Sequence, residues 1–259
     1  MQQKIYLTEV VLLTKTTNLQ DFKDWLEWHL DKCHFEHCHI FDNESPVDIK
    51  GVCDKYGSLV TYERIKGFPD QYTLYNRYIN RDSKAWWVLP IDDDEFLWMR
   101  DFSNVNDMIL HYQSKWRDMC KLSIRWKNMF PKDVNTDRGS LSLMAYCSEA
   151  NEQWAALFDG GNKPVKTFVR TTGPVNYSLA TKETHNPIVC NQLSYLCNGE
   201  RLKGNWYFGE DTDDALKLLH YQFKSKKEWI WKCNHRNRVS MSGGKLYQKC
   251  RELVWKRMV

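Results

Sequence analysis

The chain has 259 residues, of which 42% are hydrophobic and 27% charged, and a formal net charge of +4. This composition is typical of a globular protein with one large domain and excludes a disordered or fibrous chain. Its longest apolar stretches fall short of a membrane span, so we expect neither a transmembrane helix nor a signal peptide.

The first hundred residues alternate between strand and helix patterns. A strand, a helix and a second strand in this order form a βαβ unit, whose two strands are parallel. We expect Asn18 to cap the first helix and Ser103 to cap the helix that follows this region. The predicted strands are 5–13, 37–41, 59–65 and 85–91, and the predicted helices are 18–30, 71–82 and 105–112.

The second half of the chain predicts a mixed arrangement of strands with long connections. Apolar and polar residues alternate over 120–127, which is typical of a half-buried strand. A helix is expected to begin near Asp213 and to run into His220. The other predicted elements are strands at 141–146 and 165–170 and connections at 128–140 and 148–164. Together the patterns predict an α/β fold with a mixed sheet flanked by helices.

The most informative stretch is a buried strand that ends in four consecutive acids, Asp92, Asp93, Asp94 and Glu95. Adjacent carboxylates repel one another unless a cation lies among them. On an extended backbone Asp92 and Asp94 would point to the same side, so their oxygens could share one hard cation. Acid clusters are usually solvated loops, but apolar residues on both sides favour a metal site here. Pro90 calls for a bend or bulge just before the acids.

Several other motifs are absent or weak. The cluster of Cys and His residues over 33–39 lacks a second ligand pair at zinc-finger spacing. The glycine-rich loops of P-loop enzymes and dinucleotide oxidoreductases do not occur, nor does the nucleophile elbow of the α/β hydrolases. Nine cysteines without paired spacing favour a reducing, cytoplasmic compartment.

The C-terminal segment 224–257 is strongly basic. It holds eleven Lys and Arg residues against two acids, and aromatic residues are interleaved with them. Such a segment suggests contact with a polyanion, either nucleic acid or an anionic membrane surface. The alternative is an amphipathic helix whose tryptophans pack on the core and whose lysines are solvated. We expect a basic, helical extension over 224–259.

Five segments occur along the chain in a recognisable order. They are Asp-Asn-Glu-Ser at 42–45, the helix at 71–76, Asp-Asp-Asp-Glu-Phe at 92–96, Val-Lys-Thr at 165–167 and His-Tyr-x-x-Lys-Ser-x-x-Glu-Trp at 220–229. In this order they resemble glycosyltransferases of the GT-A fold, and most closely the family-92-like (formerly DUF23) branch of the family-2 superfamily; the segments at 92–96 and 220–229 are the most specific. The resemblance implies a GT-A domain over 1–223, with a nucleotide-binding half (1–100) and an acceptor half (101–223).

The resemblance also implies a metal-dependent transferase that uses a nucleotide-sugar donor, a UDP-sugar by preference. Mn²⁺ is the first choice of metal because a neutral imidazole suits it better than Mg²⁺. The residues that match family positions are Asp92, Asp94 and His220 for the metal; Asp42, Asp92 and Asp93 for the donor; and Asp94 and Asp211 for catalysis, with Asp133 and Asp137 as weaker candidates for the base. Lys224, expected one helical turn after His220, would lie close enough to it to contact a phosphate of the donor.

Each of these assignments has a plainer alternative. His220 could be a core histidine, Asp42 could close the turn that follows it, and Lys224 could be a solvated lysine. The acceptor is either a glycan or lipid-linked saccharide, or a hydroxymethylated base in viral DNA, which would have to be flipped out of the duplex. A non-catalytic nucleic-acid-binding module is the non-enzymatic alternative. A nuclease or phosphotransferase would need a second acid cluster.

Overall fold

The computed structural model describes residues 3–67, 70–133, 138–139, 141–149, 164–178, 183–189, 194–202, 215–222, 224–225 and 227–228. The chain forms two compact units. The first comprises Met1–Trp126 and Lys163–Leu218, and the second comprises Lys127–Asn162 and Leu219–Val259. None of the helices within the described ranges is long and apolar enough to cross a membrane.

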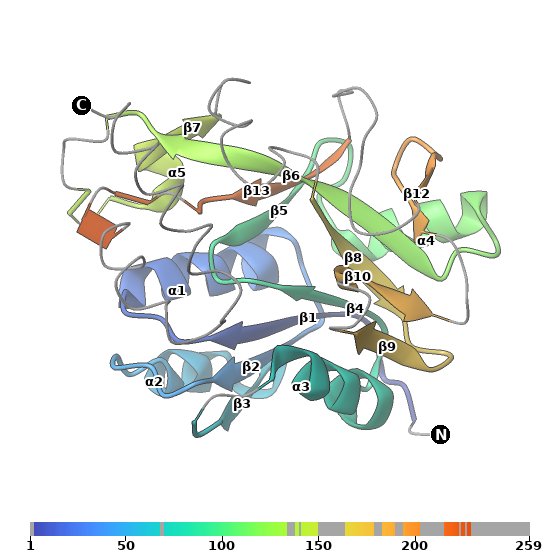
Figure 1. The fold of residues 1–259 in the computed structure, drawn as a ribbon, viewed down its shortest axis with the longest axis horizontal. Helices are drawn as coiled ribbons and strands as arrows, with labels where there is room; N and C mark the ends of the chain where they lie inside the picture. The colour runs from blue at the N-terminus through green and yellow to red at the C-terminus, as the bar shows by residue number, and fades with distance from the viewer. Residues whose placement is uncertain are drawn as a thin grey trace. The chain divides into compact units, whose positions relative to one another are not determined.

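The first unit is built on four parallel strands, as the sequence predicted. They are β1 (Tyr6–Thr14), β2 (His37–Asp42), β3 (Val60–Arg64) and β4 (Ala85–Ile91). They lie side by side in the order β3-β2-β1-β4 (Figure 1). The chain therefore reverses its direction of travel across the sheet at β1. In open α/β sheets ligands bind at such a switch point, beyond the carboxyl ends of the two central strands.

Beyond β4 the sheet becomes mixed. β8 (Val165–Arg170) pairs antiparallel with β4 and with the first part of β6 (Lys121–Pro131). The short strands β11 (Ser194–Tyr195) and β12 (Arg201–Leu202) continue the sheet past β6. The prediction of an α/β fold with a mixed sheet flanked by helices is confirmed.

Pro90 fits into β4 without the bulge that the sequence suggested. It pairs with Val11 on the β1 side. On the other side β8 pairs with β4 only at Trp87 and Val88. The ladder therefore ends before Pro90, where a missing N–H would have broken it.

Helices cover both faces of the parallel strands. Val11 and Val88 pack with Tyr75 and Ile79 of the segment that begins with α3 (Gln71–Arg77). Thr8 faces the other way and its hydroxyl donates to Asn106 of α4 (Val105–Lys115). This opposition follows from the alternation of side chains along a strand. The other helical segments are α1 (Leu19–Glu27) with a π-helical turn at Trp28–Lys32, a π-helical turn after α3 at Tyr78–Asp82, and α2 (Lys50–Cys53) with a 3₁₀ turn at Asp54–Leu59.

Local capping explains where the helices begin. The Asn18 side chain accepts hydrogen bonds from the backbone N–H groups of Gln20 and Asp21, as predicted. The cap of α4 is Asn104, whose side chain accepts from the N–H of Asn106, so the prediction of Ser103 was wrong by one residue.

Two further predictions in the second half were wrong. Residues 216–220 form a strand, β13 (Leu216–His220), whose buried and half-buried residues alternate with the period of a strand rather than of a helix. β13 pairs with β5 (Glu95–Met99), and the Arg100 N–H donates to the carbonyl of Ala215. Residues 128–131, expected to be a connection, belong to β6.

The second unit contains a short helix where a strand was expected. α5 (Leu143–Tyr146) begins at Ser142, whose side chain accepts from the N–H of Ala145. β7 (Cys147–Glu149) follows and pairs antiparallel with the end of β6. Strands that the sequence analysis did not anticipate are β9 (Val175–Ser178) and β10 (Glu183–Val189), which form a hairpin in the first unit, and the short strands β11 and β12.

Candidate functional site

The four acids lie in a tight turn between β4 and β5. The Glu95 N–H donates to the Asp92 carbonyl over 3.1 Å, and the Asp92 N–H donates to Glu95 Oε2 over 2.8 Å. Trp25 of α1 donates its ring N–H to both carbonyl oxygens, at 3.1 Å for Asp92 and 3.0 Å for Glu95. We call residues 92–95 the acid turn. Because the backbone here turns, the extended geometry that was expected to align Asp92 with Asp94 does not apply.

The acid turn is anchored across the switch point. The Thr14 hydroxyl, at the carboxyl end of β1, donates to Asp93 Oδ2 over 2.6 Å. Thr14 itself is buried, whereas Asp93 is partly exposed. The carboxyl ends of β1 and β4 are thus joined by a side chain from each. This is the edge of the sheet at which α/β proteins bind their ligands.

A buried lysine neutralises part of the acid turn. Lys166, on β8, places Nζ 2.9 Å from Asp92 Oδ2 and 3.4 Å from Glu95 Oε2. Its side chain is only 6% exposed. Burial alone would lower the pKa of Lys166, but the carboxylates of Asp92 and Glu95 raise it above its ordinary value. The ammonium therefore stays charged at neutral pH.

Glu95 is the most deeply buried acid of the turn. Its side chain is fully buried, and its Oε1 has no hydrogen-bond partner among the described residues. Burial raises the pKa of Glu95 to about 8, although the Lys166 ammonium acts in the opposite direction. Asp94 is also buried, while Asp92 is 32% exposed. The turn thus combines two buried acidic side chains, Asp94 and Glu95, with the partly exposed Asp92.

The acid turn fits a divalent cation that is completed by a substrate. No group of three or more His, Cys, Asp or Glu side chains converges among the described residues. Protein sites for Mg²⁺ commonly supply only one or two carboxylates and leave the remaining positions to phosphates and water. Asp92 and Asp94 are the two carboxylates that the sequence assigned to such a site, and the unpartnered Glu95 Oε1 lies in the same turn.

His220 lies in the second unit, at the end of β13, and is buried. Its Nδ1 is 3.2 Å from Asn128 Oδ1. The Asn128 side chain thus contacts the His220 ring and orients it. Metal-binding histidines are commonly oriented in this way by a second residue. His220 ends a strand, so the expectation that Lys224 follows it by one helical turn was wrong.

The Asp42 carboxylate closes the turn after β2. Its Oδ1 accepts from the N–H of Ser45 over 2.8 Å, and its Oδ2 accepts from the Tyr62 hydroxyl over 2.6 Å. Glu44 within this turn has φ of +55°, which few residues other than glycine adopt. Burial and the bond to Asp42 raise the pKa of Tyr62 to about 12. The plainer alternative for Asp42, that it closes the following turn, is therefore what the structure shows.

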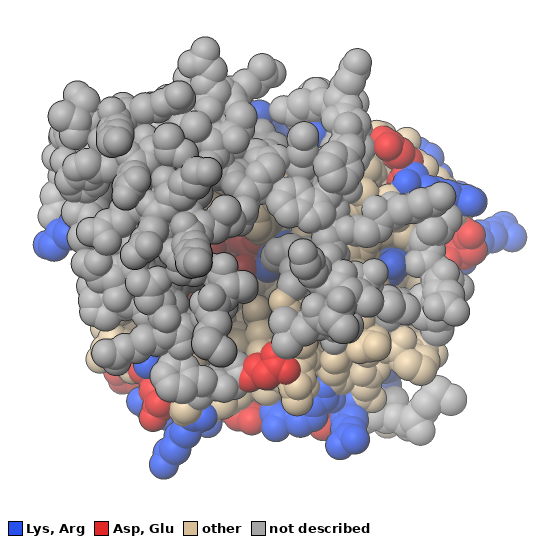
Figure 2. Space-filling model, in the orientation of Figure 1, with Lys and Arg blue, Asp and Glu red and all other residues tan. Residues whose placement is uncertain are grey.

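The remaining predicted residues lie in the second unit or outside the described residues. Lys224 is half-buried and Asp133 is exposed, both in the second unit. Asp137 and Asp211 lie outside the described residues, as does the basic segment from residue 229 onward. On the face in Figure 2, acidic and basic side chains of described residues alternate along the lower rim.

Sequence reasoning missed the roles of Lys166, Thr14 and Trp25. A signal for Lys166 was present, because charged side chains are rarely fully buried unless they are paired, and Lys166 lies in a strand that was expected to be part of the sheet. Thr14 and Trp25 gave no such signal, since a threonine at a strand end and a tryptophan on a helix face are ordinary core residues.

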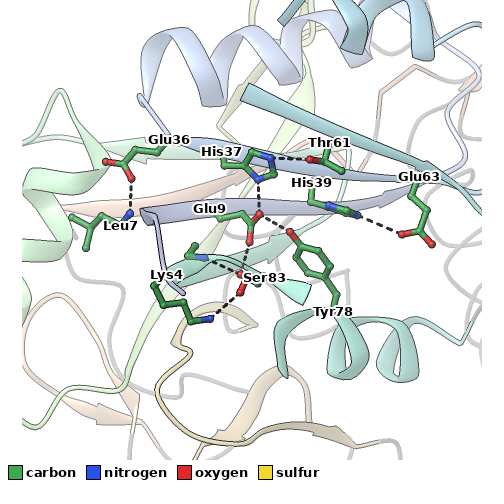
Figure 3. Close-up of polar contacts among 11 residues, drawn as sticks. Lys4, Leu7, Glu9, Glu36, His37, His39, Thr61, Glu63, Tyr78 and Ser83 are labelled. Carbon is green, nitrogen blue, oxygen red and sulfur yellow. Dashed lines mark hydrogen bonds and ion pairs between the residues drawn. The ribbon is translucent and has the colours of Figure 1, made fainter. Parts of the chain in front are cut away.

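A second buried polar network lies farther from the carboxyl ends of the strands (Figure 3). Its centre is Glu9 of β1, which is fully buried. Glu9 Oε1 accepts from the Tyr78 hydroxyl and contacts His37 Nδ1, each over 2.5 Å. Glu9 Oε2 accepts from the Ser83 hydroxyl over 2.6 Å, and His37 Nε2 is 3.0 Å from the Thr61 hydroxyl. We call these five residues the Glu9 network.

No protein family matches the chain, and no curated protein matches it in sequence. Among solved structures, a TarS fragment from S. aureus in complex with UDP-GlcNAc matches with 11% identity and a TM-score of 0.43, over 81% of this chain and 60% of that one. A second structure of S. aureus TarS, residues 1–349, matches with 13% identity and a TM-score of 0.38, over 64% of this chain and 47% of that one.

A 4-diphosphocytidyl-2C-methyl-D-erythritol synthase from Anaerococcus prevotii matches with 11% identity and a TM-score of 0.36, over 64% of this chain and 70% of that one. The chain thus spans about half the length of the TarS structures that it matches, 47% and 60%. Superpositions at these TM-scores do not establish a shared function, so the functional argument rests on the chain's own geometry.

Proposed function

We propose that this chain is a metal-dependent glycosyltransferase that moves a sugar from a nucleotide-sugar donor to an acceptor hydroxyl. The observation that carries the proposal is the acid turn at the carboxyl end of β4. It lies at the switch point of a parallel sheet and is tied to β1 by the bond between Thr14 and Asp93. A nucleotide in such a sheet binds at this edge.

The proposed metal ligands are Asp92, Asp94 and His220, with Mn²⁺ preferred over Mg²⁺. A divalent cation held there would neutralise charge on the diphosphate leaving group, which is worth several kcal/mol in the transition state. The carboxylate pair supports this proposal through its oxygen chemistry. The contact with Asn128 supports the assignment of His220, because metal-binding histidines are commonly oriented by a second residue of this kind.

The other roles belong to the chain's own polar groups. Thr14 holds Asp93 in place beside the donor, and Asp42 serves the nucleoside through the turn that it closes. Lys224 is proposed to contact a donor phosphate, and Asp211 to take the proton of the attacking hydroxyl. Asp94 completes the catalytic set as the innermost acid of the proposed metal pair.

We propose a UDP-sugar as donor and a glycan or lipid-linked saccharide as acceptor, in a cytoplasmic setting. Membership of the family-92-like branch is part of this proposal. It rests on the segments at 92–96 and 220–229. The division into a transferase domain over 1–223 and an extension over 224–259 is proposed on the same basis.

A hydroxymethylated base in viral DNA is the second candidate acceptor. The eleven basic residues against two acids in 224–257 favour it, because neutralising phosphates is the main source of affinity for nucleic acid. The same charge would attract an anionic membrane surface. Acceptor assays with glycans, lipid-linked saccharides and hydroxymethylated DNA distinguish these cases.

The experiment that tests the proposal is hydrolysis of a panel of nucleotide sugars with Mn²⁺, with Mg²⁺ or with EDTA. We expect slow cleavage of one donor that requires the metal. Asp94→Asn should reduce this cleavage at least about a hundredfold, because it removes a charged ligand. Asp54→Asn is the matched control, since Asp54 is an exposed aspartate paired with Lys50.

Equal cleavage by wild type and Asp94→Asn would contradict the proposed role of the acid turn. Absence of both cleavage and Mn²⁺-dependent nucleotide binding would exclude the enzyme. A non-catalytic module that binds nucleic acid through 224–257 would then be the account to pursue.

A further inference from the structure

Lys166 occupies a specific position relative to the acid turn. β8 runs antiparallel to β4, and their ladder ends at Val88, so the earlier residues of β8 extend back toward the end of β4. Lys166 then reaches both Asp92 and Glu95 with one ammonium group, over 2.9 and 3.4 Å. The lysine lies 74 residues later in the chain than Asp92.

The electrostatic balance of the acid turn depends on this lysine. Four carboxyl groups lie within four consecutive residues. Thr14, the partner of Asp93, is a neutral donor. Lys166 brings a full positive charge into a buried place, where screening by water is weak. It therefore offsets part of the negative charge that would attract a divalent cation.

The lysine also contacts carboxylate oxygens that could otherwise bind a cation. It contacts Asp92 Oδ2 and Glu95 Oε2, the latter of which already accepts from the Asp92 N–H. Glu95 Oε1 is buried and has no partner in the described chain. One ammonium group beside four acidic residues neutralises the acid turn only in part.

We propose that Lys166 is a built-in counter-cation that keeps the affinity of the acid turn for divalent cations low. The inference rests on the proposed function, because it concerns the same metal site. Its consequence is that the metal binds firmly only when a second anion, the diphosphate of the donor, is present. Lys166 is then a positioning residue that couples metal binding to donor binding.

The test is the affinity for Mn²⁺ alone, without any nucleotide, measured by the loss of the free Mn²⁺ signal in electron paramagnetic resonance. Lys166→Met keeps the length of the side chain and removes its charge. We expect it to bind Mn²⁺ about tenfold or more tightly than wild type, because an opposing charge near the ion is gone. Lys166→Arg keeps the charge and should stay close to wild type.

The matched control is Lys121→Met. Lys121 is also a buried strand lysine, and its Nζ donates to the Pro187 carbonyl over 3.1 Å. Its loss should leave Mn²⁺ affinity unchanged. If Lys166→Met does not fold, as judged by circular dichroism, Lys166→Gln is used instead, because its amide can still donate to Asp92.

Unchanged or weaker Mn²⁺ binding in the uncharged, folded variant would overturn the inference, as would a failure of wild type and variant alike to bind Mn²⁺. If Lys166→Met binds Mn²⁺ more tightly but wild type cleaves no donor, the inference about Lys166 holds and the proposed transferase function is rejected. If wild type shows metal-dependent cleavage but Lys166→Met has unchanged Mn²⁺ affinity, the transferase function holds and the inference is rejected.

Discussion

Two buried glutamates of the same sheet have opposite surroundings. Glu9 receives a hydroxyl or an imidazole at each of its oxygens, from Tyr78, His37 and Ser83. Glu95 shares one oxygen between a backbone N–H and the Lys166 ammonium, and its other oxygen has no partner among the described residues.

The hydrogen bonding of the two glutamates suggests that one serves stability and the other serves function. A buried carboxylate with every oxygen satisfied contributes to the fold, and the groups around it would be stranded without it. A buried carboxyl group with an unmet oxygen adds little stability. Buried groups of this kind cluster at functional sites. The Glu9 network therefore stabilises the sheet, whereas we propose that the acid turn takes part in the chemistry.

The largest effect should come from Glu9→Ala. It leaves His37, Tyr78 and Ser83 as buried groups without their partner, which should cost about 3–5 kcal/mol of unfolding free energy. Urea denaturation measures this loss. Glu63→Gln, at an exposed carboxylate, is the control and should cost less than about 1 kcal/mol. A small effect of Glu9→Ala would remove the contrast between the two regions.

The support beneath the acid turn should depend on pH. His29 lies there and links α1 to β5: its Nδ1 is 2.8 Å from the Trp25 carbonyl, and its Nε2 accepts from the Leu97 N–H. Burial lowers the pKa of His29 to about 3, although the bond to Trp25 acts in the opposite direction.

The unfolded chain therefore takes up the proton of His29 before the folded protein does, and the stability from His29 is present above the unfolded pKa of about 6.5. It should be lost as pH falls from there toward about 3, by at most about 1.4 kcal/mol per pH unit. Urea denaturation of wild type and His29→Gln at several pH values gives the difference between them. Parallel pH profiles would show that His29 is not the group responsible.

Thr14→Val should have a moderate effect at the switch point. It removes the hydroxyl that donates to Asp93, and hydrogen bonds to charged groups are worth about 1.5–3 kcal/mol when buried. Because Asp93 is partly exposed, about 1–2 kcal/mol is expected by urea denaturation. Mn²⁺-dependent donor cleavage should also fall, whereas Thr14→Ser should keep both properties. Unchanged cleavage in Thr14→Val would show that the link across the strands is structural only.

The smallest effect should come from Asp42→Asn. The new amide oxygen can still accept from Ser45, so the loss of stability should be within about 1 kcal/mol. Nucleotide affinity, measured by calorimetry with UDP and Mn²⁺, should change little because the turn is kept. A tenfold loss of affinity at unchanged stability would instead show that the carboxylate itself contacts the nucleoside.

The predictions of secondary structure were most accurate where the local residue pattern and the topology agree. The strands around Val11 and Val88 and the cap at Asn18 follow from periodicity and side-chain chemistry, and the parallel order follows from the βαβ rule. The helix expected to run into His220 failed because Leu216 and Leu218 also fit the two-residue period, and pairing with β5 decided between the two.

The acids of the candidate site could be found from the sequence, but their environment could not. A run of four carboxylates beside a buried strand is visible in a linear sequence. The partners Thr14 and Lys166 come from distant segments, and only strand order and register bring them to the turn. Long-range pairing of this kind leaves no local pattern to read.

The measurement that tests the central claim most directly is anomalous diffraction from crystals grown with Mn²⁺ and UDP. The account predicts a manganese peak within bonding distance of Asp92 or Asp94, next to a diphosphate at the carboxyl ends of β1 and β4. A manganese peak elsewhere, or UDP bound away from this edge of the sheet, would contradict it.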